Sequence, residues 1–251
     1  MTRRVALVTG GARGIGGASC IALARDGADI AICDLGEESS AAATMAEVAA
    51  AGRTARYYRA DVSDRARIEA MFDAIQTDFG RLDIVVNNAA YSVRNYLVDL
   101  DYADVERVWA VIQGGTFHCS QLGARRMIAQ QSGGSIVMIS SVHAERPFPR
   151  STAYNGAKAA VNQMALTWAA ELAPHHIRVN VIEPGWTDTP GERAFYSEEQ
   201  IRKEGAALPL GRLAEPSEIA SAVRFLCSGE ASYVTGSILR VDGGIILPAA
   251  R

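Results

Sequence analysis

Short apolar segments alternate with longer helical segments along the whole chain, and this order is the strongest constraint on its fold. In the first half the pattern predicts strands over 4–9, 29–34, 54–60 and 82–87, with helices over 14–27, 37–51 and 64–79 between them. The strand segments VALVT and IVV are apolar at every position, which indicates a sheet covered on both faces. Strands that alternate with helices pair in parallel through right-handed crossovers.

The second half continues this alternation and then becomes less regular. Helices are predicted over 102–131, 153–173 and 216–228, and strands over 135–140, 177–182 and 237–241. The stretch from Pro184 to Gly211 has little periodicity, so we expect a lid over a ligand at about 186–211. Residues 1–251 are therefore predicted to form a single α/β domain, with a doubly wound parallel sheet in three α/β/α layers.

Composition excludes several classes of protein. Of the 251 residues, 49% are apolar and 21% are charged, which suits a folded soluble chain and excludes a disordered one. The formal net charge of −3 provides no basic field for a nucleic acid, and no segment approaches the roughly 20 apolar residues that span a bilayer. Neither the four cysteines nor the four histidines show metal-ligand spacing. We therefore expect a cytoplasmic protein that binds no metal, membrane or nucleic acid.

Glycines cluster in the turn after the first predicted strand, which reads TGGARGIG at 9–16. Glycine tolerates the positive φ of a sharp strand-to-helix turn, and its missing Cβ lets a pyrophosphate approach the backbone. The helix that begins near Gly14 directs its free N–H groups and its positive end toward the same point. The position of the cluster therefore predicts a dinucleotide-binding turn, with the spacing G-x-x-x-G-x-G. The predicted contacts are Gly10, Arg13, Gly14, Ile15 and Gly16.

Asp34 ends the second predicted strand, 18 residues after Gly16. A carboxylate at this place accepts hydrogen bonds from the adenosine ribose hydroxyls and repels a 2′-phosphate. Arg13 favours the opposite choice, because a guanidinium beside the phosphates could hold an additional one. None of the four residues after Asp34 is basic, so NAD is predicted rather than NADP.

Tyr154 and Lys158 are four residues apart on one predicted helix, so they share a face. A free phenol has a pKa of about 10 and is a poor base at neutral pH. A neighbouring ammonium group in a water-poor site, helped by a positively charged nicotinamide ring, would lower that pKa. Ser141 lies 13 residues before Tyr154, at the carboxyl end of a strand, where open α/β sheets bind ligands. Ser141, Tyr154 and Lys158 are the predicted catalytic residues.

With these features together, the chain resembles the short-chain dehydrogenase/reductase family over nearly its whole length. The resemblance is carried by TGGARGIG, Asp34, Asp61-Val62, NNAA at 87–90, Ser141, YNGAK at 154–158, PGWTDT at 184–189 and VDGG near the end. It implies a Rossmann fold and hydride transfer between a nicotinamide dinucleotide and a small alcohol or ketone. It also implies a homotetramer, built through the helices at 102–131 and 153–173.

The resemblance further implies which residues hold the cofactor. Asp61 and Val62 would flank the adenine, and Asn88 would lie against a ribose. Thr187 and Thr189 would bind the nicotinamide carboxamide through backbone and hydroxyl groups. These roles complete the predicted cofactor site.

The resemblance assigns the catalytic roles as well. Tyr154 would exchange a proton with the substrate oxygen, Ser141 would hold that oxygen, and Lys158 would bind the nicotinamide ribose and lower the pKa of the tyrosine. Two residues depart from the family pattern. Ile112 occupies the place of an asparagine that holds a water beside the lysine, and Ala90 replaces the usual glycine of NNAG. We predict that activity is retained, since the hydride and proton donors are present.

Polar residues follow Ser141 in the loop expected to line the substrate site. The predicted substrate contacts are Ser141, His143, Arg146 and, from the lid, Trp186. Directional hydrogen bonds of this kind suit a polyhydroxylated substrate, which favours a sugar or polyol dehydrogenase, although a solvated loop would explain the same residues. One alternative is a 3-oxoacyl-thioester (acyl carrier protein) reductase, against which Asp34 argues. Another is a non-catalytic NAD-binding protein, which Ile112 alone favours.

Overall fold

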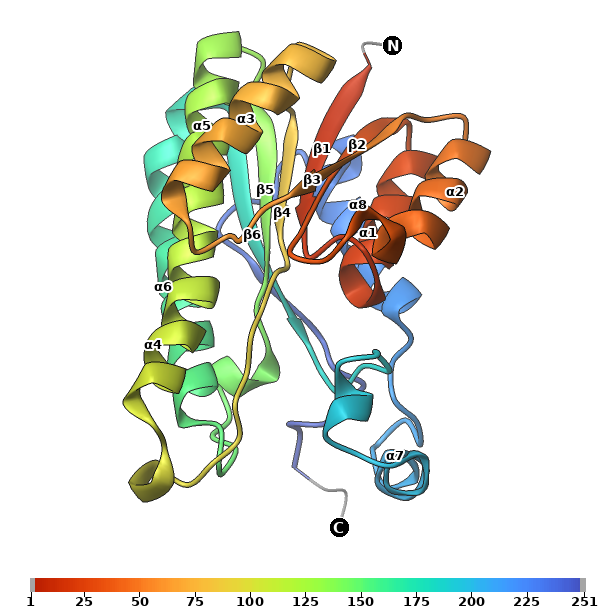
Figure 1. Ribbon diagram of the computed structural model, residues 1–251, viewed down its shortest axis with the longest axis vertical. Helices are drawn as coiled ribbons and strands as arrows, with labels where there is room; N and C mark the ends of the chain where they lie inside the picture. The colour runs from red at the N-terminus through yellow and green to blue at the C-terminus, as the bar shows by residue number, and fades with distance from the viewer. Residues whose placement is uncertain (1–2, 249–251) are drawn as a thin grey trace.

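Seven parallel strands form the sheet at the centre of the computed structural model, which describes residues 3–248 (Figure 1). The strands are β1 (Arg4–Thr9), β2 (Ala28–Asp34), β3 (Ala55–Arg59), β4 (Ile84–Asn87), β5 (Gly134–Ile139), β6 (Ile177–Pro184) and β7 (Ile238–Val241). Their order is β3-β2-β1-β4-β5-β6-β7. The predicted doubly wound parallel sheet, a Rossmann fold, is confirmed. Residues 1, 2 and 249–251 of the predicted domain lie outside the described part of the chain.

The strands are apolar at successive positions because both faces of the sheet are buried. In β1, Val5 and Leu7 pack into one apolar cluster, whereas Ala6 and Val8 pack into the other. Side chains of a strand alternate between its two faces, so a strand with a core on each side needs apolar residues throughout.

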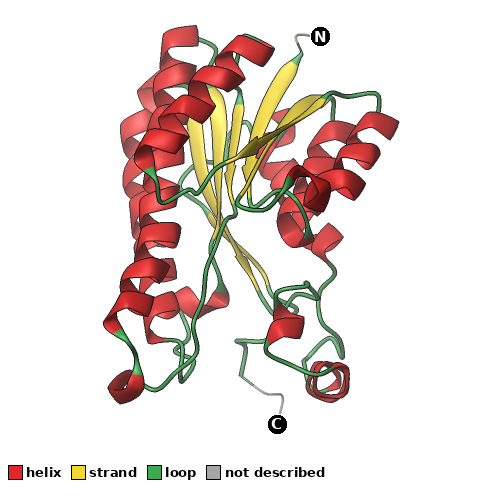
Figure 2. Ribbon diagram, in the orientation of Figure 1, coloured by secondary structure: helices red, strands yellow, loops and turns green. Residues whose placement is uncertain are grey.

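Helices cover both faces, as Figure 2 shows by colour. One face carries α1 (Gly14–Arg25), α2 (Ala42–Ala50) and α8 (Pro216–Cys227), and the other carries α3 (Arg65–Phe79), α4 (Tyr102–Trp109), α5 (Gly115–Gln130) and α6 (Thr152–Leu172). The helix α7 (Glu198–Ala206) lies apart from both layers, beyond the carboxyl ends of the strands. Among residues 3–248, we find no helix long and apolar enough to cross a bilayer.

The order of strands changes direction between β1 and β4. The chain first builds outward from β1 through β2 to β3, then returns to place β4 on the other side of β1. Val8 of β1 pairs with Val86 of β4, so the turns that follow these two strands lie side by side. Ligands of open α/β sheets bind at such a switch point, outside the carboxyl ends of the strands.

Three predicted elements differ from those in the structure. The helix predicted over 37–51 begins as a 3-10 turn (Glu38–Ala41) and continues as α2. The helix predicted over 102–131 is divided into α4, a π-helical segment (Ala110–Gly114) and α5. The segment predicted as an unpatterned lid over 186–211 contains α7, whose first turn is closed by a capping box between Ser197 and Gln200. Only Ile201 and Gly205 of α7 are buried, so its sequence lacks the apolar periodicity that would have predicted a helix.

Candidate active site

The turn after β1 requires glycine at three positions, through its backbone conformation or through close contacts. Gly10 and Gly14 have φ of +62° and +58°, in the left-handed region that favours glycine. A Cβ built on Gly16 would lie 2.0 Å from the carbonyl oxygen of Gly10 and 2.6 Å from Nδ2 of Asn88. α1 begins after Arg13, and no side chain caps its first turn. The first N–H groups of α1 are therefore available to an anion such as a pyrophosphate.

Asn88, which the resemblance places against a ribose, holds this turn from the neighbouring strand. Its Nδ2 donates hydrogen bonds to the carbonyl oxygens of Thr9 (2.9 Å) and Gly10 (3.1 Å). Its backbone N–H donates to the Thr9 hydroxyl oxygen at 3.0 Å. The ends of β1 and β4 are thus joined at the point where a dinucleotide would cross the sheet.

Asp34 lies at the carboxyl end of β2, next to the glycine turn. Its Oδ2 accepts a hydrogen bond from the backbone N–H of Ala12 (3.1 Å), and its Oδ1 accepts one from Leu35 (2.8 Å). Arg13 is exposed at the same turn, whereas Ile15 packs against the apolar cluster on the α1 side. The structure therefore holds one carboxylate at the edge where an adenosine ribose would lie.

The Asp61-Val62 pair follows β3 and is tied to the helices on the opposite face. Asp61 Oδ2 lies 2.7 Å from Nη2 of Arg107, and its Oδ1 accepts hydrogen bonds from Ser63. Burial would raise the pKa of Asp61, but these hydrogen bonds outweigh burial and lower it. Val62 is buried, and a Cβ on Gly115 would lie 2.6 Å from its Cγ2. This close approach explains why α5 begins with a glycine.

The segment after β6 lies over the glycine turn. Thr187 is buried, and its hydroxyl donates to the carbonyl oxygen of Gly185 at 3.2 Å. The Cγ2 of Thr189 would lie 3.6 Å from a Cβ built on Gly14. Trp186 donates a hydrogen bond from Nε1 to Glu192 Oε2 at 2.9 Å. Thr189 is thus brought next to the start of α1, and Thr187 lies two residues before it in the same segment.

Ser141, Tyr154 and Lys158 meet at the carboxyl end of β5. Ser141 is buried two residues after the end of this strand, and its hydroxyl oxygen accepts a 3.2 Å hydrogen bond from the backbone N–H of His143. Its side chain lies close enough to the phenol of Tyr154 to act on the pKa of that group. One turn further along α6, the Lys158 amine donates a 2.6 Å hydrogen bond to the carbonyl oxygen of Ile139, the last residue of β5. The Lys158 Nζ lies 5.4 Å from the centre of the Tyr154 ring. The structure brings the three predicted catalytic residues together.

The ionisation of this group differs from our expectation. Burial raises the pKa of Tyr154 to about 12, although the Ser141 side chain opposes this change. Burial also lowers the pKa of Lys158 to about 8, because its amine has only a neutral carbonyl as partner. In the chain alone, therefore, Lys158 does not make the phenol acidic. A further positive charge beside the phenol would lower its pKa.

Comparison with known proteins identifies this arrangement. The family described as Enoyl-(Acyl carrier protein) reductase matches residues 10–246. A short-chain dehydrogenase/reductase of Armillaria gallica is 36% identical over 97% of this chain and 96% of its own. Cis-4-hydroxycyclohexanecarboxylate dehydrogenase of Sinomonas cyclohexanicum is 39% identical over 96% of both chains. The crystal structure of acetoin dehydrogenase from Enterobacter cloacae has a TM-score of 0.90 and 38% identity, covering 100% of this chain and 98% of that chain.

This chain belongs to the short-chain dehydrogenase/reductase family. It is therefore an oxidoreductase, and its family uses NAD(P) and acts on small-molecule substrates. The resemblance stated from the sequence is confirmed at the level of the family.

Ile112 is a departure of this short-chain dehydrogenase/reductase from the family pattern. It lies in the π-helical segment between α4 and α5 and is 1% exposed, within the apolar cluster on the α6 side. An apolar side chain cannot hold a water near Lys158, and the carbonyl of Ile139 is the partner that the amine has instead. Ala90, the second departure, is exposed in the loop after β4.

His143 projects its ring beside Tyr154. The ring stacks on Phe148 (4.1 Å between centroids) and meets the Tyr154 ring edge-on (5.3 Å). Its Nδ1 lies 2.7 Å from Oδ1 of Asn155, whose own amide nitrogen donates to the Phe148 carbonyl. Because that bond fixes the amide, Nδ1 carries the proton and Nε2 is a hydrogen-bond acceptor. Burial lowers the pKa of His143, so the ring is neutral near pH 7.

The predicted substrate residue Arg146 lies at the margin of this group, with its Cζ 5.5 Å from the centre of the Phe148 ring that stacks on His143, and further residues reach the site. Arg146 is exposed and donates to the carbonyl oxygen of Ile245 at 3.0 Å, so it lies against the C-terminal segment. Sequence reasoning missed Arg94 and Glu192, whose charges both act on the Tyr154 hydroxyl. Neither belongs to a motif, so only the folded chain could reveal them. Asn155 was also missed, although it lies inside the YNGAK motif.

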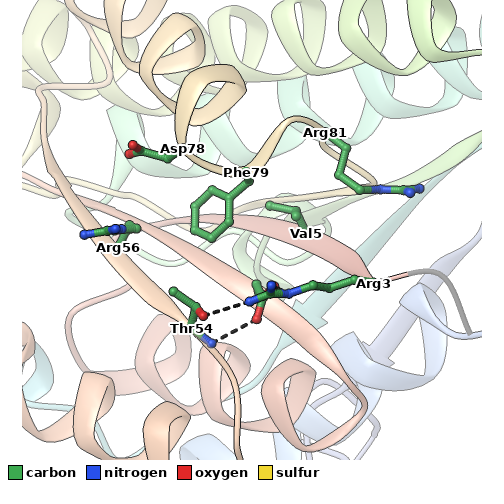
Figure 3. A pocket seen from close by; sticks show the side chains of 8 residues that line it. Arg3, Val5, Thr54, Arg56, Asp78, Phe79 and Arg81 are labelled. Atoms are coloured by element: carbon green, nitrogen blue, oxygen red, sulfur yellow. Dashed lines mark hydrogen bonds and ion pairs between the residues drawn. The ribbon is translucent and has the colours of Figure 1, made fainter.

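A separate cavity of about 290 Å³ lies at the opposite edge of the sheet, near the amino ends of β1 and β2 (Figure 3). It is lined by Arg3, Val5, Asp29, Thr54, Arg56, Asp78, Phe79 and Arg81. Arg3 pairs with Asp29, and Arg81 pairs with Asp83, so most of its charges are already neutralised. No predicted site residue borders it. Across residues 3–248, there is no cluster of three potential metal ligands.

Proposed function

We propose that this protein is an NAD(H)-dependent oxidoreductase that transfers a hydride between nicotinamide and a secondary alcohol or ketone. The proposal rests on one observation. Ser141, Tyr154 and Lys158 lie together at the carboxyl ends of the strands, the same end of the sheet as the glycine turn. The residues that would hold the dinucleotide are Gly10, Arg13, Gly14, Ile15, Gly16, Asp34, Asp61, Val62, Asn88, Tyr154, Lys158, Thr187 and Thr189. When bound, NAD would accept the hydride, and the residues of the chain would bind the substrate and transfer its proton.

In the proposed reaction the chain's own residues bind the substrate and move its proton. Ser141 holds the substrate oxygen, and Tyr154 removes the hydroxyl proton during oxidation or returns it during reduction. The high pKa of the buried phenol suits it to donate a proton during reduction. The positive nicotinamide of bound NAD would lower that pKa and favour the alcohol-oxidising direction.

The direct test is NADH formation from a panel of sugars, polyols and simple secondary alcohols at alkaline pH. Oxidation of at least one substrate class is expected, at a rate that rises with pH as the phenol loses its proton. If the protein binds NADH yet oxidises none of these alcohols and reduces none of the matching ketones, the catalytic proposal fails. The non-catalytic reading favoured by Ile112 would then replace it.

Asp34 is the residue proposed to select NAD. The wild-type protein is expected to bind NADH about 100-fold more tightly than NADPH, because repulsion between two like charges costs several kcal/mol. Asp34→Ala should reduce this ratio to about 10-fold or less by removing the charge. The measurement is the Kd of each dinucleotide by fluorescence titration.

Asp34→Glu serves as the matched control, since it keeps the charge and should keep a preference for NADH. A wild-type protein that already prefers NADPH would contradict the NAD assignment. It would also favour a 3-oxoacyl-thioester reductase, the activity class closest to the acyl-carrier description of the matching family.

A sugar or polyol is the proposed substrate class. The neutral His143 places a hydrogen-bond acceptor beside Tyr154, which suits a second hydroxyl on the substrate. Trp186 donates its indole N–H to Glu192, whose charge acts on Tyr154, and its ring packs against Tyr196. Aromatic rings of this kind pack on sugar rings. Two relatives are named for small polar substrates, acetoin and a hydroxycyclohexanecarboxylate, which also supports a small polar alcohol.

We further propose that the protein is a cytoplasmic homotetramer. The helices expected at the interface expose large apolar side chains, Trp109 of α4, Phe117 of α5 and Leu166 of α6. Such residues on neighbouring helices form an apolar surface suited to a second copy. All four cysteines are free and buried, which suits a reducing compartment.

A further inference from the structure

Arg94 reaches from the loop after β4 onto the lid. Its Cζ lies 4.3 Å from the centre of the Phe195 ring and 4.9 Å from that of Tyr196. Two aromatic rings on one guanidinium fix the plane of the group through cation–π contact. A guanidinium that stacks on rings through its faces keeps the N–H groups at its edge free for a planar acceptor such as a carboxylate. A lysine amine has no such planar set of donors.

The hydrogen-bond donors of Arg94 are largely unused. Within the described part of the chain its one charged contact is Glu192, with 3.5 Å between Nη2 and Oε2. That separation is long for a charge-assisted hydrogen bond, which measures about 2.7–2.9 Å. The same Oε2 already accepts a 2.9 Å hydrogen bond from Trp186. The Arg94 side chain is only 25% exposed, so a partly desolvated cation lacks a close acceptor.

Arg94 is also held near the reacting groups. The backbone N–H of Asn95 donates a 3.0 Å hydrogen bond to the carbonyl oxygen of Arg150, four residues before Tyr154. The positive charge of Arg94 opposes the rise that burial causes in the pKa of Tyr154 and adds to the lowering that burial causes in the pKa of His143, so it acts on both groups. A ligand bound at the Tyr154 hydroxyl would therefore have the guanidinium within its reach.

We propose that Arg94 is a specificity-determining residue that binds a carboxylate of the substrate through the free edge of its guanidinium. The site would then take hydroxy acids and oxo acids, in which one carbon is a secondary alcohol or ketone and another bears the carboxylate. This inference rests on the proposed oxidoreductase function, and within the proposed sugar and polyol class it favours substrates that also carry a carboxylate, such as sugar acids, over neutral ones. Glu192 keeps the cation oriented through the lid until the substrate carboxylate replaces it as the nearer partner.

A different role for the same contacts is a latch, in which Arg94 only fastens the lid. The two roles predict different responses to substrate charge. A latch variant impairs every substrate to the same extent, because the lid covers all of them. A carboxylate-binding residue affects charged substrates and spares neutral ones of the same shape.

The test compares three carboxylates with their primary amides, in both directions of the reaction and with saturating dinucleotide. The probes are 3-hydroxybutyrate, 4-hydroxycyclohexanecarboxylate and gluconate, chosen to vary the distance between hydroxyl and carboxylate. Wild-type kcat/KM is expected to be at least about 10-fold higher for the best carboxylate than for its amide. Arg94→Gln should lower kcat/KM for that carboxylate by about 100-fold, mainly through KM, and change the amide by less than about three-fold.

Three further variants sharpen the result. Arg94→Lys keeps the positive charge but lacks the planar set of N–H donors, so kcat/KM for the carboxylate should fall by about 10-fold. Glu192→Gln removes a competing negative charge and should raise kcat/KM for the carboxylate relative to that for the amide. Arg193→Gln breaks lid contacts with Asp188 and Glu198 and should leave the carboxylate-to-amide ratio unchanged.

Equal losses on carboxylates and amides in Arg94→Gln would overturn the inference and identify a latch. A wild-type protein that oxidises amides or neutral polyols as well as every carboxylate would overturn it too, while leaving the oxidoreductase function intact. If no alcohol or ketone of either kind reacts, the failure lies with the proposed function itself.

Discussion

Tyr154→Phe is expected to lower kcat/KM for alcohol oxidation by about 10³–10⁴-fold while the Kd for NADH stays within about three-fold of wild type. In the proposed reaction the phenol exchanges a proton with the substrate oxygen, and the Ser141 side chain beside it holds that oxygen. Phenylalanine keeps the ring that meets His143 edge-on, so the surrounding packing is preserved. Steady-state kinetics with the best alcohol and calorimetric titration with NADH measure the two effects.

Tyr58→Phe is the matched control for this substitution. Tyr58 lies on β3, away from the catalytic residues, and its hydroxyl donates a 2.7 Å hydrogen bond to Asp78. The activity of this variant should therefore stay within about two-fold of wild type. A Tyr154→Phe protein that retained a tenth of wild-type activity would mean that another group moves the proton. Loss of NADH binding in the same variant would show that the phenol holds the dinucleotide instead.

Lys158→Met is expected to make the protein more stable and nearly inactive. Burial depresses the pKa of Lys158 from 10.5 to about 8, a difference that corresponds to roughly 3 kcal/mol of destabilisation below pH 8. Methionine fills a similar volume without a charge, so the free energy of unfolding at pH 7 should rise by up to about 3 kcal/mol. Turnover should fall by about 10³-fold, because the proposed contact with the nicotinamide ribose is lost.

The stability gain should depend on pH with a definite sign. Between about pH 8 and pH 10.5 the folded amine binds fewer protons than the unfolded one, so rising pH stabilises the wild-type protein. The gap between Lys158→Met and wild type should therefore shrink from about 3 kcal/mol below pH 8 toward zero above pH 10.5. Urea denaturation at several pH values measures the gap. A gap that stays constant would show that the amine is not desolvated.

The fold was predictable from sequence because its determinants are local and repeated. β1 was predicted over the residues that form it, since its apolar side chains face two cores at once. The boundary errors lie where apolar periodicity is weak. α7 is a short polar helix fixed by a capping box, and the π-helical segment inserts extra residues per turn while keeping Ile112 buried.

The candidate site was predictable only where residues belong to a motif. Ser141, Tyr154 and Lys158 lie at fixed spacings around one strand and one helix, so their meeting follows from topology. Arg94 and Glu192 come from two loops about 100 residues apart, and no spacing rule joins such loops. The protonated nitrogen of His143 depends on Asn155 and the Phe148 carbonyl, which only coordinates could place.

Asp34 accepts backbone hydrogen bonds from Ala12 and Leu35, so the residue proposed to select the dinucleotide also holds the glycine turn in place. The carboxylate that would distinguish two dinucleotides also pins the loop on which either must rest. A variant in which Asp34 is replaced to favour NADPH would also lose these hydrogen bonds and hold the phosphate-binding turn less firmly. A change of dinucleotide preference at this position is therefore expected to benefit from a second substitution near the start of α1 that restores a partner for the N–H of Ala12.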